Sequence, residues 1–404
     1  MSAYYNPLDP AFREDPYPQL HRLRLEDPVH WVEQAYCWVL TRYHDIRGVL
    51  ADPRFAIALD WLSTYPSIQM QMQEPYNQII RTQILSADPP SHTRIRSIMA
   101  RHFTVAKLDA LRPLIQRMTD ECIARARAAG EIDLISGFAY RMPFLVVCEM
   151  MGVPPAERDP LEHWTHALMR STDANPMAPD ELAACNHAAY AFRYYFLDLA
   201  ERRKSEDSQD IFCDMVRSRD EGKLAEEEMI ANFILLFCAG HDTVVNLFGN
   251  GLIALFQHRD QMELLRRDPS LIRGAVEELL RYDTSVQIAR RTALEPVQVG
   301  GRWIGAGQYV VCSLGAGNRD PEVFENPDCL DVTRKNVKPL SFGGGIHHCL
   351  GAQLARLEGE IGLRTLLERL PDLELESLNP HWRQNTTIRG LESLPARCAI
   401  GARQ

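Results

Sequence analysis

One segment near the middle of the chain limits its fold more than any other. Residues Glu226 to Phe256 carry apolar side chains at helical spacing, which predicts a helix of about thirty residues. At a rise of about 1.5 Å per residue, such a helix is long enough to traverse a domain of this size. Its longest apolar run, Phe233 to Gly240, is too short to cross a bilayer. We therefore expect a soluble protein built around one long helix.

The periodicity of helices continues on both sides of this segment. Two shorter helices are expected up to Tyr282, and another over roughly Leu350 to Leu370. Five earlier segments have apolar residues at helical spacing, with acidic residues or Pro near several of their starts: Ser91 to Phe103, Val105 to Ala129, Ala156 to Ser171, Pro179 to Lys204 and Gln209 to Arg219.

Predicted strands are few and short. Val29 to Glu33 and Tyr36 to Thr41 favour a small hairpin, residues between Val286 and Cys312 favour a meander, and Ile388 to Ile400 favour a closing hairpin. Ala56 to Leu85 has no period, and we expect a binding loop or lid there. Without a linker or repeat, the sequence predicts one domain over residues 1–404, mainly α with minor β-structure.

Composition excludes several classes of function. With a formal net charge of −10, the chain repels nucleic acid and anionic lipid as a whole. Its N-terminus lacks the basic stretch followed by an apolar one that marks a signal peptide. Its ten cysteines include no C-x-x-C pair, so most are expected to be reduced, buried side chains in a cytoplasmic protein.

The most informative short motif is F-G-G-G-I-H-H-C-L-G, from Phe342 to Gly351. Its consecutive glycines permit unusual backbone angles, and the residues after Gly351 begin a helix. Cys349 therefore lies at a helix N-terminus, where the positive end of the helix dipole favours the thiolate form that binds metals. Glycines on both sides let a flat, bulky ligand approach the backbone.

Three other interpretations fit this loop less well. A buried structural cysteine is the common case for a single Cys, but the glycines argue against it. A phosphate-binding G-x-G-x-x-G fails because His348 occupies the sixth position. A zinc site on His347, His348 and Cys349 is disfavoured because adjacent side chains diverge.

The motif resembles the haem-binding loop of the cytochrome P-450 family, F-x-x-G-x-x-x-C-x-G. Phe342, Gly345, Cys349 and Gly351 all fit this pattern, and Gly343 lies within it. The resemblance implies the single-domain P-450 fold, with the long central helix over a haem b and with Cys349 as the axial thiolate of the iron, a ligand that favours O–O cleavage. The likeness extends from about Pro16 to the C-terminus.

A second motif, A-G-H-D-T from Ala239 to Thr243, interrupts the apolar face of the long helix. On the residues alone, Thr243 could simply hydrogen-bond to the carbonyl of Ala239. The motif also resembles the family's A-G-x-[DE]-T. The resemblance implies that Ala239 and Gly240 lie at the haem and that Gly240 and Thr243 loosen the helix to make a groove for dioxygen. It also implies that Thr243 and Asp242 deliver protons.

E-L-L-R occurs twice, as Glu263 to Arg266 and as Glu278 to Arg281. In each copy the charges stand at i and i+3, and this spacing alone predicts no more than a surface pair worth under ~1 kcal/mol. The segment after the second copy resembles that after the family's E-x-x-R. This implies that Glu278 and Arg281 form a buried pair that supports the haem loop together with Arg334.

Haem propionates require cations or strong donors when buried. The resemblance assigns this role to His92, Arg96, Arg291 and His347, although each alone is more often a surface residue. It also implies a mainly apolar substrate pocket. Six residues are expected in its lining: Leu235, Val244, Val286, Gln287, Ile288 and Ile388.

The function implied by the resemblance is that of a monomeric haem-thiolate monooxygenase. Such an enzyme hydroxylates or epoxidises a small organic substrate with one oxygen atom from O2. The segment Arg389 to Pro395 resembles members that act on polyketides and related specialised metabolites. No flavin or iron–sulfur module is visible, so a separate ferredoxin and its reductase are expected to supply electrons at a basic face that includes Arg101, Arg356 and Arg364.

Three alternative functions remain open at this point. A peroxide-driven haem-thiolate enzyme would need no redox partner, although such relatives usually lack the pair formed by Asp242 and Thr243. A haem-binding sensor or carrier would keep Cys349 but turn over nothing. A nucleotide-binding protein would use the glycine loop and bind no haem.

Overall fold

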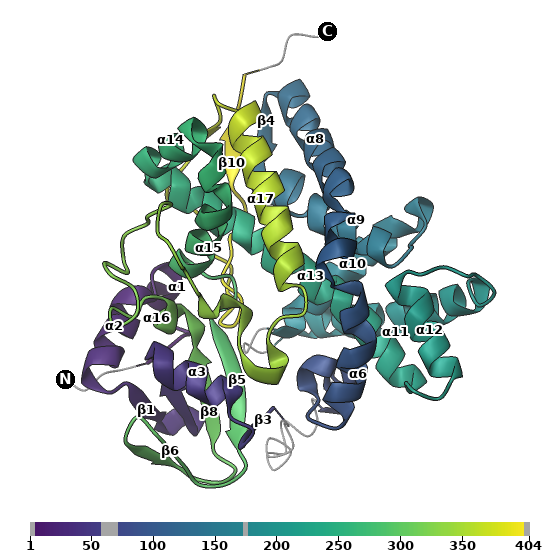
Figure 1. The fold of residues 1–404 in the computed structure, drawn as a ribbon, viewed down its shortest axis with the longest axis horizontal. Helices are drawn as coiled ribbons and strands as arrows, with labels where there is room; N and C mark the ends of the chain where they lie inside the picture. Colours follow the sequence, from purple (N-terminus) through teal and green to yellow (C-terminus); the bar gives the residue numbers. More distant parts are fainter. Residues whose placement is uncertain (1–4, 58–71, 173–176, 400–404) are drawn as a thin grey trace. The chain divides into compact units, whose positions relative to one another are not determined.

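The computed structural model describes residues 5–57, 72–172 and 177–399, which are mainly helical with few strands (Figure 1). The chain divides into two compact units. The first contains residues 1–56, 112–143 and 243–404, and the second contains residues 57–111 and 144–242. Each unit is therefore assembled from segments that are far apart in the sequence.

A five-stranded sheet forms one part of the first unit, in the order β1-β2-β8-β5-β3. The predicted N-terminal hairpin is confirmed, since β1 and β2 pair antiparallel, with Val29 opposite Leu40. β2 also pairs in parallel with β8, which the sequence did not predict. The strands are β1 (Val29–Val32), β2 (Cys37–Leu40), β3 (Phe55–Ala56), β5 (Ile288–Ala293) and β8 (Tyr309–Ser313).

Two smaller sheets complete the β-structure of the first unit. β6 (Val297–Val299) and β7 (Arg302–Ile304) form a hairpin whose turn residues, Gly300 and Gly301, have φ of 53° and 84°. The expected closing hairpin is wrong, because the C-terminal strand pairs with distant strands instead of with itself. Ala396 lies opposite both Ile132 and Leu375 in this three-stranded sheet of β4 (Glu131–Asp133), β10 (Pro395–Arg397) and β9 (Glu374–Leu375).

Helices of the first unit pack closely where glycine allows it. A Cβ on Gly362 of α17 would lie 2.5 Å from the ring of Phe248, so the glycine permits this approach. α17 also runs beside α8, as Figure 1 shows. The helices are α1 (Pro10–Glu14), α2 (Tyr17–Glu26), α3 (Tyr43–Ala51), α8 (Arg112–Ala129), α14 (Arg259–Arg267), α15 (Ile272–Tyr282), α16 (Leu314–Asn318) and α17 (Ala352–Arg369). Shorter turns are η1 (Glu33–Ala35), the π-helical η5 (Leu134–Ala139), η8 (Pro269–Leu271), η9 (Leu340–Phe342) and η10 (Gly345–His347).

The second unit has an aromatic core. Phe192 and Phe196 stack at 5.6 Å between ring centroids, and Phe212 and Phe233 stack at 4.5 Å. Its helices are α5 (Pro75–Thr82), α6 (Ser91–Met99), α7 (Val105–Asp109), α10 (Arg158–Met169), α11 (Pro179–Arg202) and α12 (Ile211–Asp220), and α9 (Arg141–Met150) belongs mostly to it. Its turns are η3 (Ile84–Ser86), η4 (Ala100–His102), η6 (Pro155–Glu157) and η7 (Arg170–Thr172).

Two predicted segments differ from the structure here. The single helix expected from Val105 to Ala129 is divided into α7 and α8, because Pro113 has no N–H to continue the ladder of the preceding turn. The expected loop from Ala56 to Leu85 contains the helix α5, which begins at Pro75. Residues 58–71 of that loop lie outside the described residues.

The long helix is confirmed as α13 (Glu226–Gln257). The boundary between the two units falls within it, between Asp242 and Thr243. By length and composition it could cross a membrane, but 67% of its apolar 18-residue stretch is buried inside the protein. This burial is typical of a core helix.

Candidate functional site

The cysteine loop lies between η9, η10 and the start of α17. The backbone N–H of Cys349 donates to the carbonyl oxygen of Phe342 at 2.9 Å, which closes the loop. Gly343 and Gly345 have φ of 67° and 64°, in the left-handed region. A Cβ on Gly345 would lie 2.1 Å from the carbonyl oxygen of Leu50, so only glycine fits at that position.

Cys349 differs in its exposure from most other cysteines. Seven of the ten are buried, Cys238 is half-buried, and Cys329 and Cys349 are exposed. Burial raises the pKa of Cys148 and Cys312 to about 12, so these two thiols stay protonated. Cys349 instead lies just before the N-terminus of an 18-residue helix, where the dipole favours a thiolate.

The residues around Cys349 fit a haem. A Cβ on Gly343 would approach no atom more closely than 3.9 Å, so the loop backbone is open to a flat ligand at this point. Within the described ranges, no three His, Cys, Asp or Glu side chains are grouped as a bare metal ion would require. A single thiolate suits an iron whose other ligands come from a porphyrin.

Glu278 and Arg281 form a fully buried ion pair on α15. Arg281 Nε donates to Glu278 Oε2 at 2.7 Å, and Nη2 donates to Oε1 at 2.8 Å. Arg334 Nε adds a bond to Oε2 at 3.1 Å, and the backbone N–H of Asp331 donates to Oε1 at 3.0 Å. The sequence-predicted trio thus lies together, with its buried charges hydrogen-bonded.

Asn318 connects this ion pair to the cysteine loop. Its carbonyl oxygen accepts from Arg281 Nη1 at 3.0 Å. Its Oδ1 accepts from the N–H of Leu340 at 2.6 Å, and its Nδ2 donates to Ser341 Oγ at 3.0 Å. Since Leu340 and Ser341 belong to η9, the ion pair supports the turn that leads into the loop. Sequence reasoning gave Asn318 no role, although the segment that begins with it, N-R-D-P from Asn318 to Pro321, resembles a motif of bacterial P-450 members and was a signal.

Several side chains near the middle of α13 are accessible, and three of them are predicted site residues. Leu235 and Thr243 are half-buried, and Ala239, between them, is exposed. Residues at i, i+4 and i+8 face the same side of a helix. The α-helix runs unbroken through Gly240, where a Cβ would lie 2.9 Å from Cγ2 of Val147 on α9. The glycine of the motif therefore serves close packing between α13 and α9.

The four predicted propionate-binding residues are divided between the units. In the second unit, His92 and Arg96 stand at i and i+4 on α6. The same unit contains Asp242, which was predicted to deliver protons. It lies at the end of that unit's part of α13 and is 2% exposed. Burial, and secondarily the charge of Arg96, lowers the pKa of His92, which favours its neutral form. In the first unit, Arg291 on β5 is buried and His347 precedes Cys349 by two residues. That these residues hold one haem stays a prediction.

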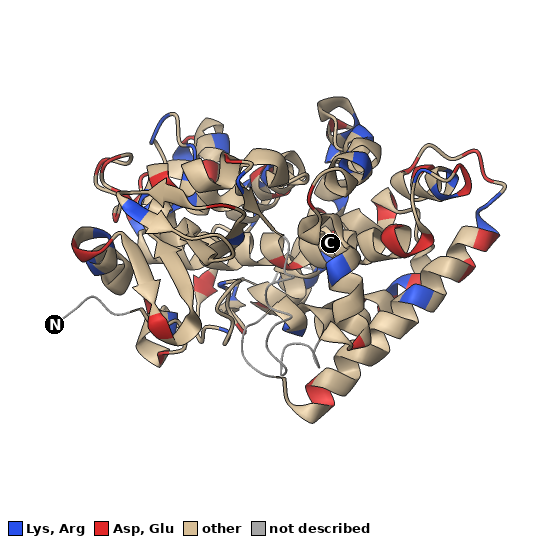
Figure 2. Cartoon of the chain, turned by 90° about the horizontal axis from the view of Figure 1, so that it is seen from below, with Lys and Arg blue, Asp and Glu red and all other residues tan. Residues whose placement is uncertain are grey.

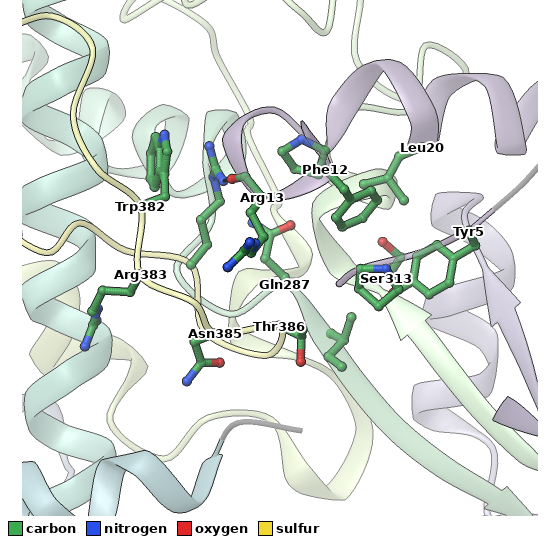
Figure 3. A pocket seen from close by; sticks show the side chains of 14 residues that line it. Tyr5, Phe12, Arg13, Leu20, Gln287, Ser313, Trp382, Arg383, Asn385 and Thr386 are labelled. Atoms are coloured by element: carbon green, nitrogen blue, oxygen red, sulfur yellow. Dashed lines mark hydrogen bonds between the residues drawn. The ribbon is translucent and has the colours of Figure 1, made fainter. Parts of the chain in front are cut away.

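The predicted substrate-pocket residues have varied surroundings. Val286 and Ile388 pair as an isolated antiparallel bridge. Gln287 and Ile288 border a small cavity of about 30 Å³ whose other side is formed by N-terminal residues such as Phe12 (Figure 3). Val244 is buried in the first unit and Leu235 is half-buried in the second. Their role in binding substrate stays a prediction.

Known proteins match the chain over nearly its whole length. The family model for cytochrome P-450 matches residues 188–388. The cytochrome P-450 monooxygenase PikC of Streptomyces venezuelae is 39% identical over 98% of this chain and 94% of its own. The chain belongs to the cytochrome P-450 family. The polyketide biosynthesis cytochrome P-450 PksS of Bacillus subtilis is 36% identical over 97% of this chain and 98% of its own.

Solved structures agree with this membership. The crystal structure of CalO2 has a TM-score of 0.91 at 33% identity and covers 99% of this chain and 100% of its own. A second P-450, BioI, solved with a fatty-acid-ligated acyl carrier protein, has a TM-score of 0.89 at 33% identity and covers 96% and 99%. The predicted family, the mainly α P-450 fold and the monooxygenase class are therefore confirmed, and haem is the cofactor of this family.

Proposed function

We propose that this cytochrome P-450 uses haem b and O2 to insert one oxygen atom into a small organic substrate, a polyketide-like or other specialised metabolite. Electrons would come from a separate ferredoxin and its reductase in the cytoplasm. The exposed Cys349 in its glycine loop at the start of α17 carries the proposal. The similarity to PksS, a polyketide biosynthesis cytochrome P-450, supports the substrate class.

Each group of residues has a chemical task in this proposal. Cys349 provides the thiolate that binds the iron of the haem. When bound, the haem supplies the redox chemistry that activates dioxygen. Arg96 and Arg291 bring positive charge to the propionates, whereas His92, with its lowered pKa, acts as a neutral hydrogen-bond donor.

Thr243 and Asp242 form the proton path of the proposal. The Thr243 hydroxyl can both donate and accept a hydrogen bond, so it can hold a proton beside the dioxygen site. Asp242 is almost fully buried and carries the one carboxyl group of the A-G-H-D-T motif. A carboxyl next to a hydroxyl on one helix is suited to general acid–base transfer.

Spectroscopy of the purified protein tests the thiolate directly. The reduced, carbon monoxide-treated protein should show the red-shifted Soret band of a thiolate-bound haem, and Cys349→Ala should lose this band. Cys329→Ala is a matched control, since Cys329 is also exposed but lies outside the glycine loop. A band that survives in Cys349→Ala, or that is lost in Cys329→Ala, would contradict the assignment.

The ferredoxin would dock at a groove of about 680 Å³ in the first unit. Phe342 and His348 line it. So do four cationic side chains and one acidic side chain: Arg273, Arg334, Lys338, Arg356 and Glu277. Figure 2 shows Lys and Arg interspersed with Asp and Glu along the chain. The lining of this groove, with four cations and one acid, is basic by comparison. Such a groove attracts an acidic electron-transfer protein.

Contacts within the groove identify the residues to test. Arg356 pairs with Glu277 and lies 4.4 Å over the ring of Phe342. Arg364, which is outside the groove, lies 3.9 Å from Glu368. Lys338 is exposed in the groove. We expect Lys338→Glu to slow reduction by a [2Fe–2S] ferredoxin several-fold at low salt, while reduction by dithionite is unchanged. Of the three arginines predicted for the docking face, Arg356 lines this groove, whereas Arg101 and Arg364 do not. Lys204→Glu, at an exposed lysine outside the groove, is the control, and equal rates in the two variants would refute this docking site.

A further inference from the structure

Two loop segments are hydrogen-bonded to the C-terminal half of α13, within the first unit. The first segment, residues 283–288, follows α15, and the second spans residues 382–391. Their backbones pair with each other, since the N–H of Arg389 donates to the carbonyl of Ser285 at 2.7 Å and the N–H of Gln287 donates to that of Thr387 at 2.9 Å. The proposed substrate-pocket residues Val286 and Ile388 form a bridge between them.

Three polar side chains connect these segments to α13. Ser285 Oγ donates to the carbonyl oxygen of Thr243 at 2.9 Å. Arg383 Nη2 donates to Oδ1 of Asn246 at 2.6 Å. Asn250 Nδ2 donates to the carbonyl oxygen of Arg389 at 3.1 Å. Thr243, Asn246 and Asn250 stand at i, i+3 and i+7, so the bonds follow one face of the helix.

The bond between Asn246 and Arg383 lies in a closely packed environment. Asn246 is fully buried. A Cβ on Gly390 would lie 1.8 Å from Asn246 Oδ1 and 2.8 Å from Arg383 Nη2, so the backbone of Gly390 lies directly against this pair. Figure 3 shows the Arg383 side chain directed away from Arg13. A buried amide bonded to a guanidinium has few other arrangements, because a buried donor or acceptor that loses its hydrogen bond costs about 1–3 kcal/mol.

We propose that Asn246, Arg383 and Ser285 are positioning residues that fix the wall at Val286 and Ile388 relative to Thr243. This inference rests on the proposed function, in which that wall faces the substrate and Thr243 handles dioxygen. These residues do not touch the reacting atoms. They set the distance between the place where oxygen is activated and the wall that orients the substrate, and therefore the carbon that receives the oxygen.

Two probes that bind the iron of the haem-loaded full chain test this inference. Imidazole is small and reports on the iron alone. The phenyl group of 4-phenylimidazole should also contact the wall at Val286 and Ile388. Asn246→Leu and Gly390→Ala should change the affinity for 4-phenylimidazole at least 5-fold and that for imidazole less than 2-fold, read from the Soret shift. Asn246→Asp, which can still accept from Arg383, should restore the ratio of the two affinities to within 2-fold of wild type.

The matched control removes a similar bond far from Thr243. Gln257, the last residue of α13, donates from Nε2 to the carbonyl of Leu378 at 3.1 Å, and Gln257→Ala should leave the ratio unchanged. If Asn246→Leu does not fold, Ser285→Ala provides the test, with an expected change of about 2–3-fold. A ratio equal to that of wild type in every folded variant would overturn the inference. Absence of the thiolate Soret band from the wild-type protein would instead refute the proposed function. Failure of the inference and failure of the proposed function are therefore distinguishable.

Discussion

The two E-L-L-R segments of this P-450 have the same letters and the same spacing but different environments. Arg266 Nη1 lies 2.6 Å from Glu263 Oε1 on α14, and Arg281 Nε lies 2.7 Å from Glu278 Oε2 on α15. The side chains of the first pair are 18% and 44% exposed, whereas both side chains of the second are 0% exposed. The distance between charges therefore says little about their contribution to stability.

The surroundings of the second pair make the difference. Arg281 also donates to the carbonyl oxygens of Asn318, Pro327 and Cys329, at 3.0, 2.7 and 3.2 Å. A buried charge is tolerated when all its donors are used, and breaking such a set leaves a charge without solvent or partner. The first pair lies near water, which replaces a lost partner at little cost.

The largest effect is expected for Glu278→Gln. This change keeps the size of the side chain but leaves the buried Arg281 without its negative partner. We expect the free energy of unfolding to fall by about 3–5 kcal/mol, measured by urea denaturation. Haem content should fall as well, because Asn318 transmits the position of Arg281 to η9. An unfolding curve that overlays that of wild type would contradict the role of this pair.

Arg334→Ala should have a smaller effect than the loss of Glu278. Arg334 is bonded to Glu278 at 3.1 Å and to the carbonyl of Glu325 at 2.7 Å, but Arg281 still neutralises the glutamate when Arg334 is absent. We expect a loss of about 1.5–3 kcal/mol in the same urea assay. The neighbouring Lys335 is exposed, and Lys335→Ala should change the stability by less than about 0.5 kcal/mol. Equal losses in the two variants would argue against an extended ion network.

Local features of the fold and site could be predicted from the sequence, and long-range ones could not. The long helix and the cysteine loop are local, since helical spacing and glycine preferences act over a few residues. The pairing of β2 with β8 joins residues about 270 positions apart, and no local pattern specifies it. α9 was missed because it is apolar on nearly every side, as the sequence F-L-V-V-C within it shows, and lacks a polar face to reveal its period.

The same limit applied to the site. The E-L-L-R letters could not distinguish a buried pair from an exposed one, and the distinction depended on resemblance to the family in the segment that follows. Asn318 was missed because its partners, Arg281 and Leu340, come from two other elements. A side chain that joins distant elements leaves no periodic signal in the sequence.

A third glutamate, which is buried like Glu278, sharpens the comparison because it lacks the cations that surround Glu278. Glu358 on α17 is 1% exposed, and no group in the described part of the chain hydrogen-bonds to either of its oxygens. Burial raises the pKa of Glu358 well above its usual range. The folded state therefore favours the protonated form, and stability is lost as the pH rises above the pKa of the unfolded chain, by up to about 1.4 kcal/mol per pH unit.

Glu358→Gln should remove this loss. We expect the variant to be more stable than wild type by about 1–2 kcal/mol at pH 7.5, with a smaller difference at pH 4.5, from urea midpoints at both values. Glu360→Gln is the control on the same helix, since Glu360 is partly exposed and lies 3.8 Å from Arg273. Parallel pH profiles for wild type and Glu358→Gln would show that Glu358 does not bind a proton on folding.

The smallest effect is expected for Glu263→Gln, the counterpart of Glu278→Gln in the exposed E-L-L-R. Glu263 is 44% exposed, so water can solvate both Arg266 and the new amide when the charge is removed. We expect a change of less than about 0.5 kcal/mol in water and none in 1 M salt, which screens what attraction remains. A loss above about 2 kcal/mol would mean that spacing and distance, not burial, determine the strength of the pair.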